Sequence, residues 1–334
     1  MRQAFGAGVL LWVAVFLPAF LFAPRQEENT RIPMETEQKV SSAVELPSNG
    51  DGEHTLLLWE EGTVREMAVE EYLRGVLRAE MGGAFHMEAL KAQTVAERTY
   101  LYYQMEAGAK AAHPSADVCV DPGCCTAYLS EEGAREKWGA VFEEYEENIH
   151  RAVSETDNQV MYYGGEPIMA VFHSSSAGVT ATSGEVWTAD LPYLVSVESP
   201  ESADTVPNYY SVNTFSAEEF RKLFTARYPE AKLTGAAASW ISDVIRSDTG
   251  RVESAVVGGV AVTGQEMRSV FSLRSTAFTV ETDAETVTFR VTGYGHGVGM
   301  SQYGANTLAQ EGKTWQEILR WYYTGITIDD YTDA

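Results

Sequence analysis

Apolar residues recur along the chain with two periods, one typical of helices and one typical of strands. Helical spacing is present in five segments: Val69–Met81, Met87–Met105, Glu131–Ala152, Ala217–Phe224 and Trp315–Tyr323. Strand-like runs, rich in β-branched and aromatic residues, occur at His54–Trp59, Val64–Val69, Gln159–Tyr163, Pro167–His173, Tyr193–Val197, Arg251–Val262 and Thr286–Val291. Because these helices and strands do not alternate regularly, we predict an α+β fold: a mixed sheet with packed helices, in two lobes.

The first 25 residues carry the longest apolar run. Ala4–Ala23 is an uninterrupted apolar segment between Arg2 and Arg25. Twenty residues at helical rise span about 30 Å, the thickness of a bilayer core, whereas a cleaved signal peptide usually has a shorter apolar core. We therefore expect residues 1–25 to form a transmembrane anchor. Residues 26–50 are polar and acidic and predict a flexible tether, which leaves residues 51–334 as one globular domain outside the cytoplasm.

The net charge limits the class of partner. The chain has 24 Lys and Arg against 48 Asp and Glu, for a net charge of −24. Nucleic acids and anionic lipid surfaces attract basic proteins, so we expect neither as the main partner. An anionic substrate would need a local basic patch set against this acidic background.

Glu80 stands where the helical pattern requires an apolar side chain. It occupies the position four residues after Val76, on the apolar stripe of Val69–Met81. A carboxyl on the buried edge of a helix costs free energy unless it is paired or protonated. Burial raises the pKa of such a group, as a general acid near neutral pH requires. The alternative is that the helix frays at Gly82 and Gly83 and that Glu80 points into solvent.

The following predicted helix, Met87–Met105, carries two cations on one side. Lys91 and Arg98 are seven residues apart and project in the same direction. They form either a solvated face with weak ion pairs or a cationic strip close to Glu80. Cations near Glu80 would favour its ionised form and oppose the effect of burial, so the direction of its pKa shift stays open at this point.

A first polar cluster, His173, Ser174 and Ser175, follows an apolar strand. A hydrolase of the Ser–His type would show a G-x-S-x-G elbow and an Asp partner, and neither is evident. The cluster is therefore either structural or binds a ligand rich in hydroxyl groups, such as a sugar.

A second cluster lies in the glycine-rich segment Gly293–Ala305. Glycines at alternate positions allow the backbone to approach a ligand or another strand closely. The polar side chains of this cluster are His296, Ser301, Gln302 and Tyr303. The segment lacks the Lys-Ser/Thr ending of a phosphate loop. A tight structural turn is the alternative, but so many glycines beside polar groups favour a binding site.

Three residues have the chemistry and spacing of metal ligands. His113, Cys119 and Cys125 follow the pattern H-x5-C-x5-C, with Cys124 next to the last of them. His and Cys are the preferred ligands of zinc. A disulfide from Cys119 to Cys124 or Cys125 is the alternative outside the cytoplasm, although it leaves one thiol over. We favour zinc in a structural role.

The motifs EEYLRGVLRAEM, EALKAQTVAERTY, FHSSSAG, GHGVGMSQYGA and LRWYYTGI together resemble the stage II sporulation protein D family over residues 54–330. The resemblance implies a membrane-anchored lytic transglycosylase of sporulating cells. Such an enzyme cuts peptide-stripped glycan strands between MurNAc and GlcNAc during engulfment and leaves 1,6-anhydroMurNAc ends. A sporulation murein amidase of the SpoIIP type and a membrane scaffold of the SpoIIM type are the implied partners. Many relatives have Pro after the Met of AEM, so we expect a more mobile loop after AEMGG.

The resemblance also assigns roles to particular residues. It gives the acid role to Glu80, and it matches Lys91 and Arg98 to the Lys and Arg that the family carries in the following helix. Similarity to clostridial members supports zinc at His113, Cys119 and Cys125. One carboxyl suffices for this reaction, so the lack of an evident second acid beside Glu80 is expected, whereas hydrolysing glycosidases usually use two. We expect Lys91 and Arg98 to hold the lactyl carboxylate that peptide removal exposes.

Two other functions compete with this interpretation. The same domain occurs in amidase enhancers, so the chain could bind the cell wall and stimulate a partner amidase without cutting glycan. A zinc peptidase or amidase is disfavoured because no H-E-x-x-H or comparable water-activating set appears.

Overall fold

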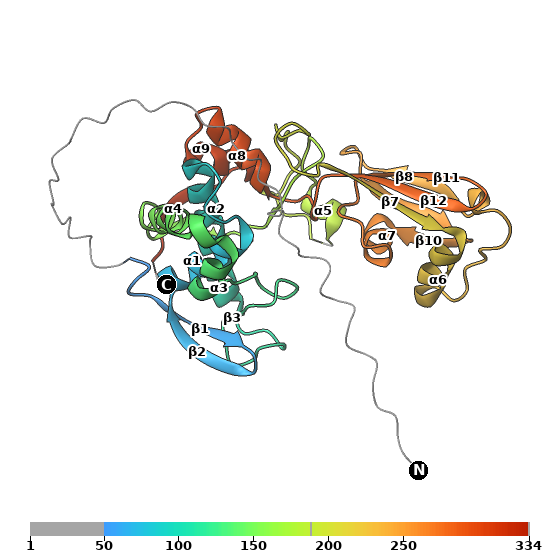
Figure 1. Cartoon of the computed structure of the whole chain (residues 1–334). Coiled ribbons are helices and arrows are strands. Elements are labelled where there is room, and N and C mark those ends of the chain that lie inside the picture. The colour runs from blue at the N-terminus through green and yellow to red at the C-terminus, as the bar shows by residue number, and fades with distance from the viewer. Residues whose placement is uncertain (1–49, 188, 333–334) are drawn as a thin grey trace, which may run out of the picture.

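The computed structural model of the protein describes residues 50–187 and 189–332. This part of the chain forms two lobes, and each has its own hydrophobic core (Figure 1). The expected anchor, residues 1–25, and all but the last residue of the expected tether lie outside the described residues. Within the described part, no helix combines the length and apolarity needed to cross a bilayer.

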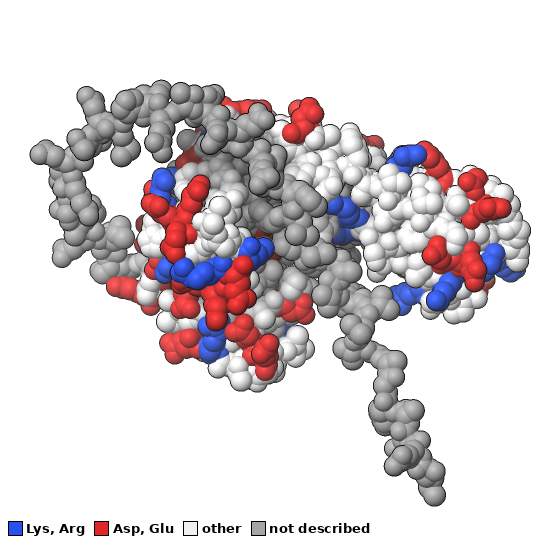
Figure 2. Space-filling model, viewed as in Figure 1, with Lys and Arg blue, Asp and Glu red and all other residues white. Residues whose placement is uncertain are grey.

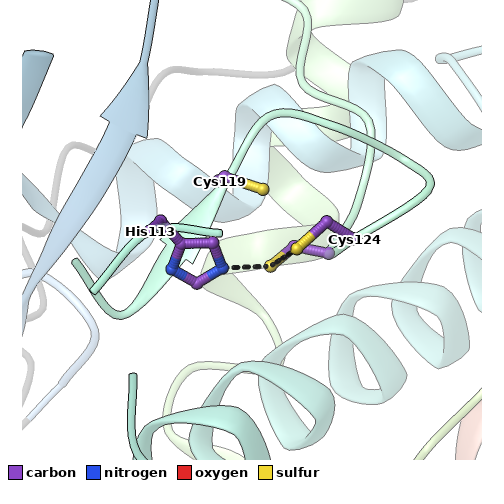
Figure 3. Close-up of side chains that lie close together, drawn as sticks. His113, Cys119 and Cys124 are labelled. Carbon is purple, nitrogen blue, oxygen red and sulfur yellow. Dashed lines mark hydrogen bonds between the residues drawn. The ribbon is translucent and has the colours of Figure 1, made fainter. Parts of the chain in front are cut away.

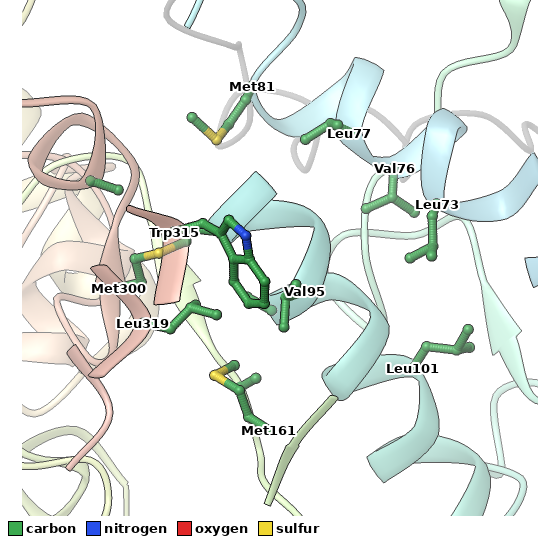
Figure 4. Packing of buried hydrophobic residues seen from close by; sticks show 14 of the residues in the cluster. Leu73, Val76, Leu77, Met81, Val95, Leu101, Met161, Met300, Trp315 and Leu319 are labelled. Carbon is green, nitrogen blue, oxygen red and sulfur yellow. The ribbon is translucent and has the colours of Figure 1, made fainter. Parts of the chain in front are cut away.

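The first lobe is built around one buried helix, α2 (Met87–Ala107). Side chains on all sides of its central turns are buried, as expected of a helix in a core rather than on a surface. The helices that pack against it are α1 (Val69–Glu80), α4 (Phe142–Ser154), α8 (Gln302–Gln310) and α9 (Trp315–Tyr322). Figure 4 shows the contact from inside: Leu73, Val76 and Leu77 of α1 face Val95 of α2, and Trp315 and Leu319 come from α9. Segments from both ends of the chain thus share one core.

Small sheets surround these helices. A hairpin of β1 (Thr55–Glu60) and β2 (Thr63–Ala68) is extended by β3 (Val118–Cys119), parallel to β1. The other strands of this lobe are β4 (Gln159–Tyr163), β5 (Glu166–Pro167) and β14 (Thr327–Asp330) in one sheet, and β6 (Phe172–His173) parallel to β13 (Met300–Ser301) in another. Short helices α3 (Glu131–Trp138) and α5 (Ser183–Val186) and a 3-10 turn, Gly139–Val141, complete it.

The second lobe is an insertion between residues 209 and 293. It contains two antiparallel three-stranded sheets, in the orders β11-β12-β7 and β10-β9-β8. Its elements are β7 (Tyr210–Ser216), α6 (Ala217–Arg227), a 3-10 turn Ala237–Ser239, β8 (Ile241–Arg246), β9 (Val252–Val257), β10 (Val260–Thr263), α7 (Gly264–Val270), β11 (Phe278–Thr282) and β12 (Thr286–Thr292). Stacked rings such as Phe220 and Phe271, 4.4 Å apart, fill its core. The chain enters and leaves at one point, where the Gly293 N–H donates to the Tyr209 carbonyl oxygen (2.9 Å).

The α+β class is confirmed, but the expectation of one mixed sheet is wrong. The described residues form five small sheets of two or three strands. The expected strand Tyr193–Val197 is a loop, because its carbonyl groups accept hydrogen bonds from Thr180 and Ser183 rather than from a neighbouring strand. The expected strand Pro167–His173 is likewise interrupted, leaving β5 and β6.

Glycines with positive φ account for two other departures from the predicted elements. The expected helix Glu131–Ala152 is broken into α3 and α4 where Gly139 adopts φ 54°. The expected strand Arg251–Val262 folds back on itself as the β9–β10 hairpin, because Gly258 and Gly259 have φ 57° and 83°.

The surface reflects the composition. On the face shown in Figure 2, acidic side chains occur over both lobes, interspersed with basic ones. Among the described residues on that face, the basic side chains lie beside acidic ones rather than in one broad patch.

Candidate functional site

Glu80 is held in a defined turn at the end of α1. The backbone N–H groups of Met81 and Gly82 both donate to the Leu77 carbonyl oxygen (3.1 and 2.9 Å), and Gly82 adopts φ 68°. This arrangement satisfies the last carbonyl groups of the helix. The Glu80 side chain is half-buried. The frayed end with a solvent-facing carboxylate therefore does not occur in this structure.

The loop after Glu80 is anchored to α4. Asn148 Nδ2 donates to the Gly83 carbonyl oxygen (3.0 Å). A Cβ at Gly83 would lie 2.3 Å from the Cα of Tyr145, so only glycine fits there. The loop after Met81 is therefore held by contacts with α4 although it lacks Pro. The greater mobility expected of it stays a prediction.

Burial dominates the electrostatics of the Glu80 carboxyl. Removal from water raises its pKa to about 7, while the backbone amide of Ala127 and the side chain of Gln302 act in the opposite direction. Gln302 Nε2 makes no hydrogen bond of standard geometry among the described residues. Lys91 and Arg98 do not contribute to the shift. The direction that sequence left open is therefore upward, and both protonation states are populated near pH 7.

A second carboxyl, Glu97 of α2, lies in the core close to Glu80. Its side chain is only 2% exposed, and Gln93 Nε2 donates to its Oε1 (3.0 Å). Burial, with the nearby charge of Glu80, raises its pKa well above the ordinary value. Sequence analysis found no second acid beside Glu80, and the structure corrects this. Because Glu97 is sealed from solvent, it does not supply the accessible second carboxylate of a hydrolysing glycosidase.

The structure brings the two polar clusters together. The backbone groups of Tyr294 and Ser175 exchange two hydrogen bonds (2.8 and 3.0 Å). At Gly295, with φ 120°, a Cβ would lie 2.7 Å from the Cβ of His173. The alternating glycines thus allow the segment Gly293–Ala305 to pack directly against His173–Ser175.

Both imidazoles of the clusters are neutral. Burial lowers the pKa of His173 and of His296 to about 3. His173 Nδ1 donates to the Val298 carbonyl oxygen (3.1 Å), while its Nε2 is buried without a partner among the described residues. His296 Nδ1 accepts from the Val298 N–H (3.1 Å). Neither ring is a proton donor at pH 7, but His173 keeps one free acceptor.

Ser301 orients helix α8. Its hydroxyl donates to the buried carboxylate of Glu201 (2.6 Å) and accepts from the Gly304 N–H (3.1 Å), as an N-cap residue does. Gln302, the first residue of α8, then faces Glu80. The Tyr303 N–H donates to the Ser174 carbonyl oxygen (3.1 Å). Ser301 therefore has a structural contact, and Gln302 is the residue of this cluster that reaches the acid.

Aromatic rings lie beside the two polar clusters. Tyr303 lies 5.1 Å from Phe85, between ring centroids. Trp187, about one third exposed, lies 5.2 Å from the His296 ring. Tyr294 contacts Arg274 of the second lobe, whose Cζ lies 4.4 Å from the ring centroid. Sequence analysis missed Trp187, Tyr294 and Arg274. Tyr294 belongs to the glycine-rich motif, but nothing in the sequence links it to Arg274.

Lys91 and Arg98 do not face this site. Arg98 is fully buried, its Nε contacts Asp51 Oδ1 (2.8 Å), and its Nη1 donates to the Gln159 carbonyl oxygen (3.2 Å). Lys91 Nζ lies 3.0 Å from Glu88 and 2.6 Å from Glu155. Both cations are satisfied by groups of the protein. The expected cationic strip beside Glu80 is therefore absent at these two positions.

The His and Cys residues gather at one point, drawn in Figure 3. Ligand atoms of His113, Cys119, Cys124 and Cys125 all lie within 4.8 Å of one another. His113 Nδ1 is hydrogen-bonded to the Ala116 carbonyl oxygen (3.0 Å), which turns Nε2 toward the Cys125 sulfur (3.3 Å). The three cysteines are free thiols, not disulfide-bonded. This set fits a metal ion, and it includes Cys124, which sequence analysis left outside the ligands.

The chain segment after this cluster leads directly to Glu80. Ala127, whose amide acts on the Glu80 carboxyl, follows Cys125 by two residues. Between them, Thr126 Oγ1 is hydrogen-bonded to the Tyr72 hydroxyl of α1 (2.8 Å). The His/Cys cluster therefore supports one of the two amides that face Glu80.

Comparisons with known proteins agree with these motifs. The family model described as stage II sporulation protein matches residues 60–163, which include Glu80 and the His/Cys cluster. Stage II sporulation protein D of Bacillus subtilis (strain 168) is 35% identical over 269 residues, 80% of this chain and 76% of that protein. The chain belongs to the stage II sporulation protein D family. The Bacillus amyloliquefaciens family member is 33% identical over 268 residues, again 80% of this chain and 76% of that protein.

A further relative carries a different name. The protein called amidase enhancer in Bacillus subtilis (strain 168) is 28% identical over 314 residues. The match covers 78% of this chain but 40% of the enhancer. The segment of the amidase enhancer that is similar to this chain is therefore less than half of that protein.

Replacing Arg98 by Gln will reduce stability, because it leaves the buried carboxylate of Asp51 without its cation. We expect a loss of about 3–5 kcal/mol in the free energy of unfolding, measured by urea denaturation. The double change Arg98→Gln with Asp51→Asn should recover part of that loss. A fully stable Arg98→Gln protein would show that the ion pair is not structural.

Proposed function

We propose that the protein is a lytic transglycosylase that cuts peptide-stripped peptidoglycan strands between MurNAc and GlcNAc. It would act in engulfment during sporulation, as membership of the family suggests. The observation that carries the proposal is one half-buried carboxyl, Glu80, whose pKa burial raises to about 7. Among the described residues, Glu97 is a second carboxyl that interacts electrostatically with Glu80, and it is sealed in the core.

The proposed reaction uses Glu80 twice. As an acid, Glu80 protonates the bridging oxygen, and the bond from that oxygen to the muramic C1 breaks. As a base, its carboxylate then takes the proton of the muramic C6 hydroxyl, whose oxygen bonds to C1 and closes the 1,6-anhydro ring. A pKa near 7 suits both steps at neutral pH. The Ala127 and Gln302 amides are placed to stabilise the carboxylate between the two steps.

Several other residues are suited to bind the sugars. His173 and Ser175 are only 4% and 2% exposed. Their unpartnered Nε2 and Oγ atoms are buried among the described residues, so a sugar reaches them no more easily than it reaches Glu97. Gln302 and Tyr303 lie on the first turn of α8, and Trp187 adds an exposed ring. We place substrate contacts on Tyr303 and Trp187, whose side chains are partly exposed, rather than on His296 or Ser301, which are engaged in structural hydrogen bonds.

We further propose that the His/Cys cluster binds zinc in a structural role. Three thiols and one imidazole are the ligands of closed zinc sites. Four protein ligands leave no position for a reactive water, which argues against a zinc peptidase or amidase. Zinc bound there would hold the segment that carries the Ala127 amide.

A second candidate function is a wall-binding protein that stimulates an amidase, and the relative named amidase enhancer favours it. Membrane attachment through Ala4–Ala23, an extracytoplasmic domain, a partner amidase and a membrane scaffold remain proposals drawn from sequence and family.

Replacing Glu80 by Gln removes the proton donor, so we expect release of 1,6-anhydro ends to fall by about 10²–10⁴-fold. Mass spectrometry of denuded glycan after incubation measures these ends. Glu71→Gln, an exposed glutamate of the same helix, is the matched control and should retain activity. Anhydro ends from Glu80→Gln at the normal rate would remove the assignment. If the unmodified protein releases no 1,6-anhydro ends, the amidase-enhancer function is favoured. Adding a murein amidase and measuring its stimulation then tests that function.

The pH dependence should follow the protonated form of Glu80, which the first step needs. We expect kcat/KM on denuded glycan to fall as pH rises through about 7, approaching tenfold per pH unit above it. A profile unchanged between pH 6 and 9 would contradict the acid role.

The purified protein should contain one equivalent of zinc by elemental analysis. Cys119→Ala should lose the metal, lower the melting temperature and reduce activity, because the Ala127 segment loosens. Cys124→Ala should also lower the zinc content, because we propose that Cys124 is the fourth ligand. A metal-free wild type of unchanged stability would overturn the zinc proposal.

A further inference from the structure

Two arginines of the second lobe lie near the site without a carboxylate partner. Arg268 and Arg274 take part in none of the ion pairs found among the described residues. Arg251, a buried arginine of the same lobe, has the carboxylates of Glu185 and Glu201 acting on it. In a chain with a net charge of −24, partly buried arginines with no counter-charge need an explanation.

Contacts fix the position of these two side chains. The Arg274 guanidinium lies over the Tyr294 ring, with Cζ 4.4 Å from its centroid, and its Nε is buried without a hydrogen-bond partner among the described residues. The Arg274 carbonyl oxygen accepts from the Gly295 N–H (3.0 Å), which ties this loop to the glycine-rich segment. Arg268 Nε donates to the Leu273 carbonyl oxygen (3.3 Å), immediately before Arg274. A guanidinium supported on one face by an aromatic ring is preorganised to bind a planar anion.

Tyr294 and Tyr303 connect these arginines to the acid. Burial raises the pKa of Tyr294, while Arg274 and Arg268 act to lower it and Glu80 acts to raise it, so all three charges act on one hydroxyl. Arg274 also acts on Tyr303, the neighbour of Gln302 on α8. The acid therefore comes from the first lobe and the unpaired cations from the second, with the two tyrosines between them.

We infer that Arg274, with Arg268 behind it, binds a carboxylate of the glycan: the lactyl group of a muramyl residue from which the stem peptide has been removed. This inference rests on the proposed function and names the part of the substrate that the second lobe recognises. An amide-linked stem peptide removes that charge from the lactyl group, and N-acetylglucosamine has no such group. A charge-assisted contact with Arg274 thus distinguishes peptide-free strands from both. Arg274 would thus make the contact with the lactyl carboxylate that the sequence analysis expected of Lys91 and Arg98.

Binding measurements with the full chain carrying Glu80→Gln, which should not cut the ligand, test the inference. The ligands are a denuded glycan tetrasaccharide, the same tetrasaccharide with its carboxyl groups reduced to alcohols, and chitotetraose. We expect the denuded glycan to bind at least about tenfold more tightly than the two neutral ligands. Adding Arg274→Gln should abolish this preference and leave the affinity for chitotetraose unchanged, while Arg274→Lys should retain part of it.

Arg290→Gln is the matched control, because Arg290 lies on β12 of the same lobe, is exposed and pairs with Glu281. It should keep the preference for the denuded glycan, and thermal unfolding verifies that each variant is folded. Equal affinity of the parent for charged and neutral ligands would overturn the inference while leaving the proposed function standing. A preference that survives Arg274→Gln, or an equal loss for all ligands, would overturn it as well. Binding of none of the three ligands would overturn the proposed function together with it.

Discussion

The carboxyl of Glu80 is kept partly out of water by segments from distant parts of the chain, and much of the local architecture serves that contact. Helix α1 delivers the carboxyl at its last turn. Helix α8 presents Gln302 to it because Ser301 caps the helix and binds the buried Glu201. The segment after the His/Cys cluster brings the Ala127 amide from a third direction. Burial alone would strongly favour the neutral form of Glu80. The amides of Ala127 and Gln302 partly offset this by lowering its pKa.

The same burial changes how the other polar residues are understood. His296 and Ser301 have the residue types of a catalytic site, yet their hydrogen bonds hold loops together. Arg98 has the charge of a substrate ligand, yet it neutralises Asp51 in the core. His173 and Ser175 are different, because each keeps a buried atom without a partner. Residue type alone is therefore a poor guide to the role of a polar side chain in this protein.

Local features of this protein were predictable from sequence, and long-range ones were not. The helical period identified α1 and α2, and the interruption of that period identified Glu80. The spacing of His113, Cys119 and Cys125 indicated the metal cluster, because its ligands lie within a short loop. Spacing could not show which way Lys91 and Arg98 face, since a helix buried on all sides has no solvated side. Arg274 lies nearly two hundred residues from Glu80, and no local pattern relates them.

The chain enters and leaves the second lobe at one place, marked by the hydrogen bond from the Gly293 N–H to the Tyr209 carbonyl oxygen, so that lobe is one continuous insertion. The family model matches residues 60–163, which contain the acid but none of the inserted lobe. Under the proposed function, substitutions within residues 210–292 would change the groups that contact the glycan carboxylate and leave Glu80 and its supporting core intact. If the proposal holds, grafting the inserted lobe of another relative onto this chain would transfer that relative's ligand preference without moving the acid.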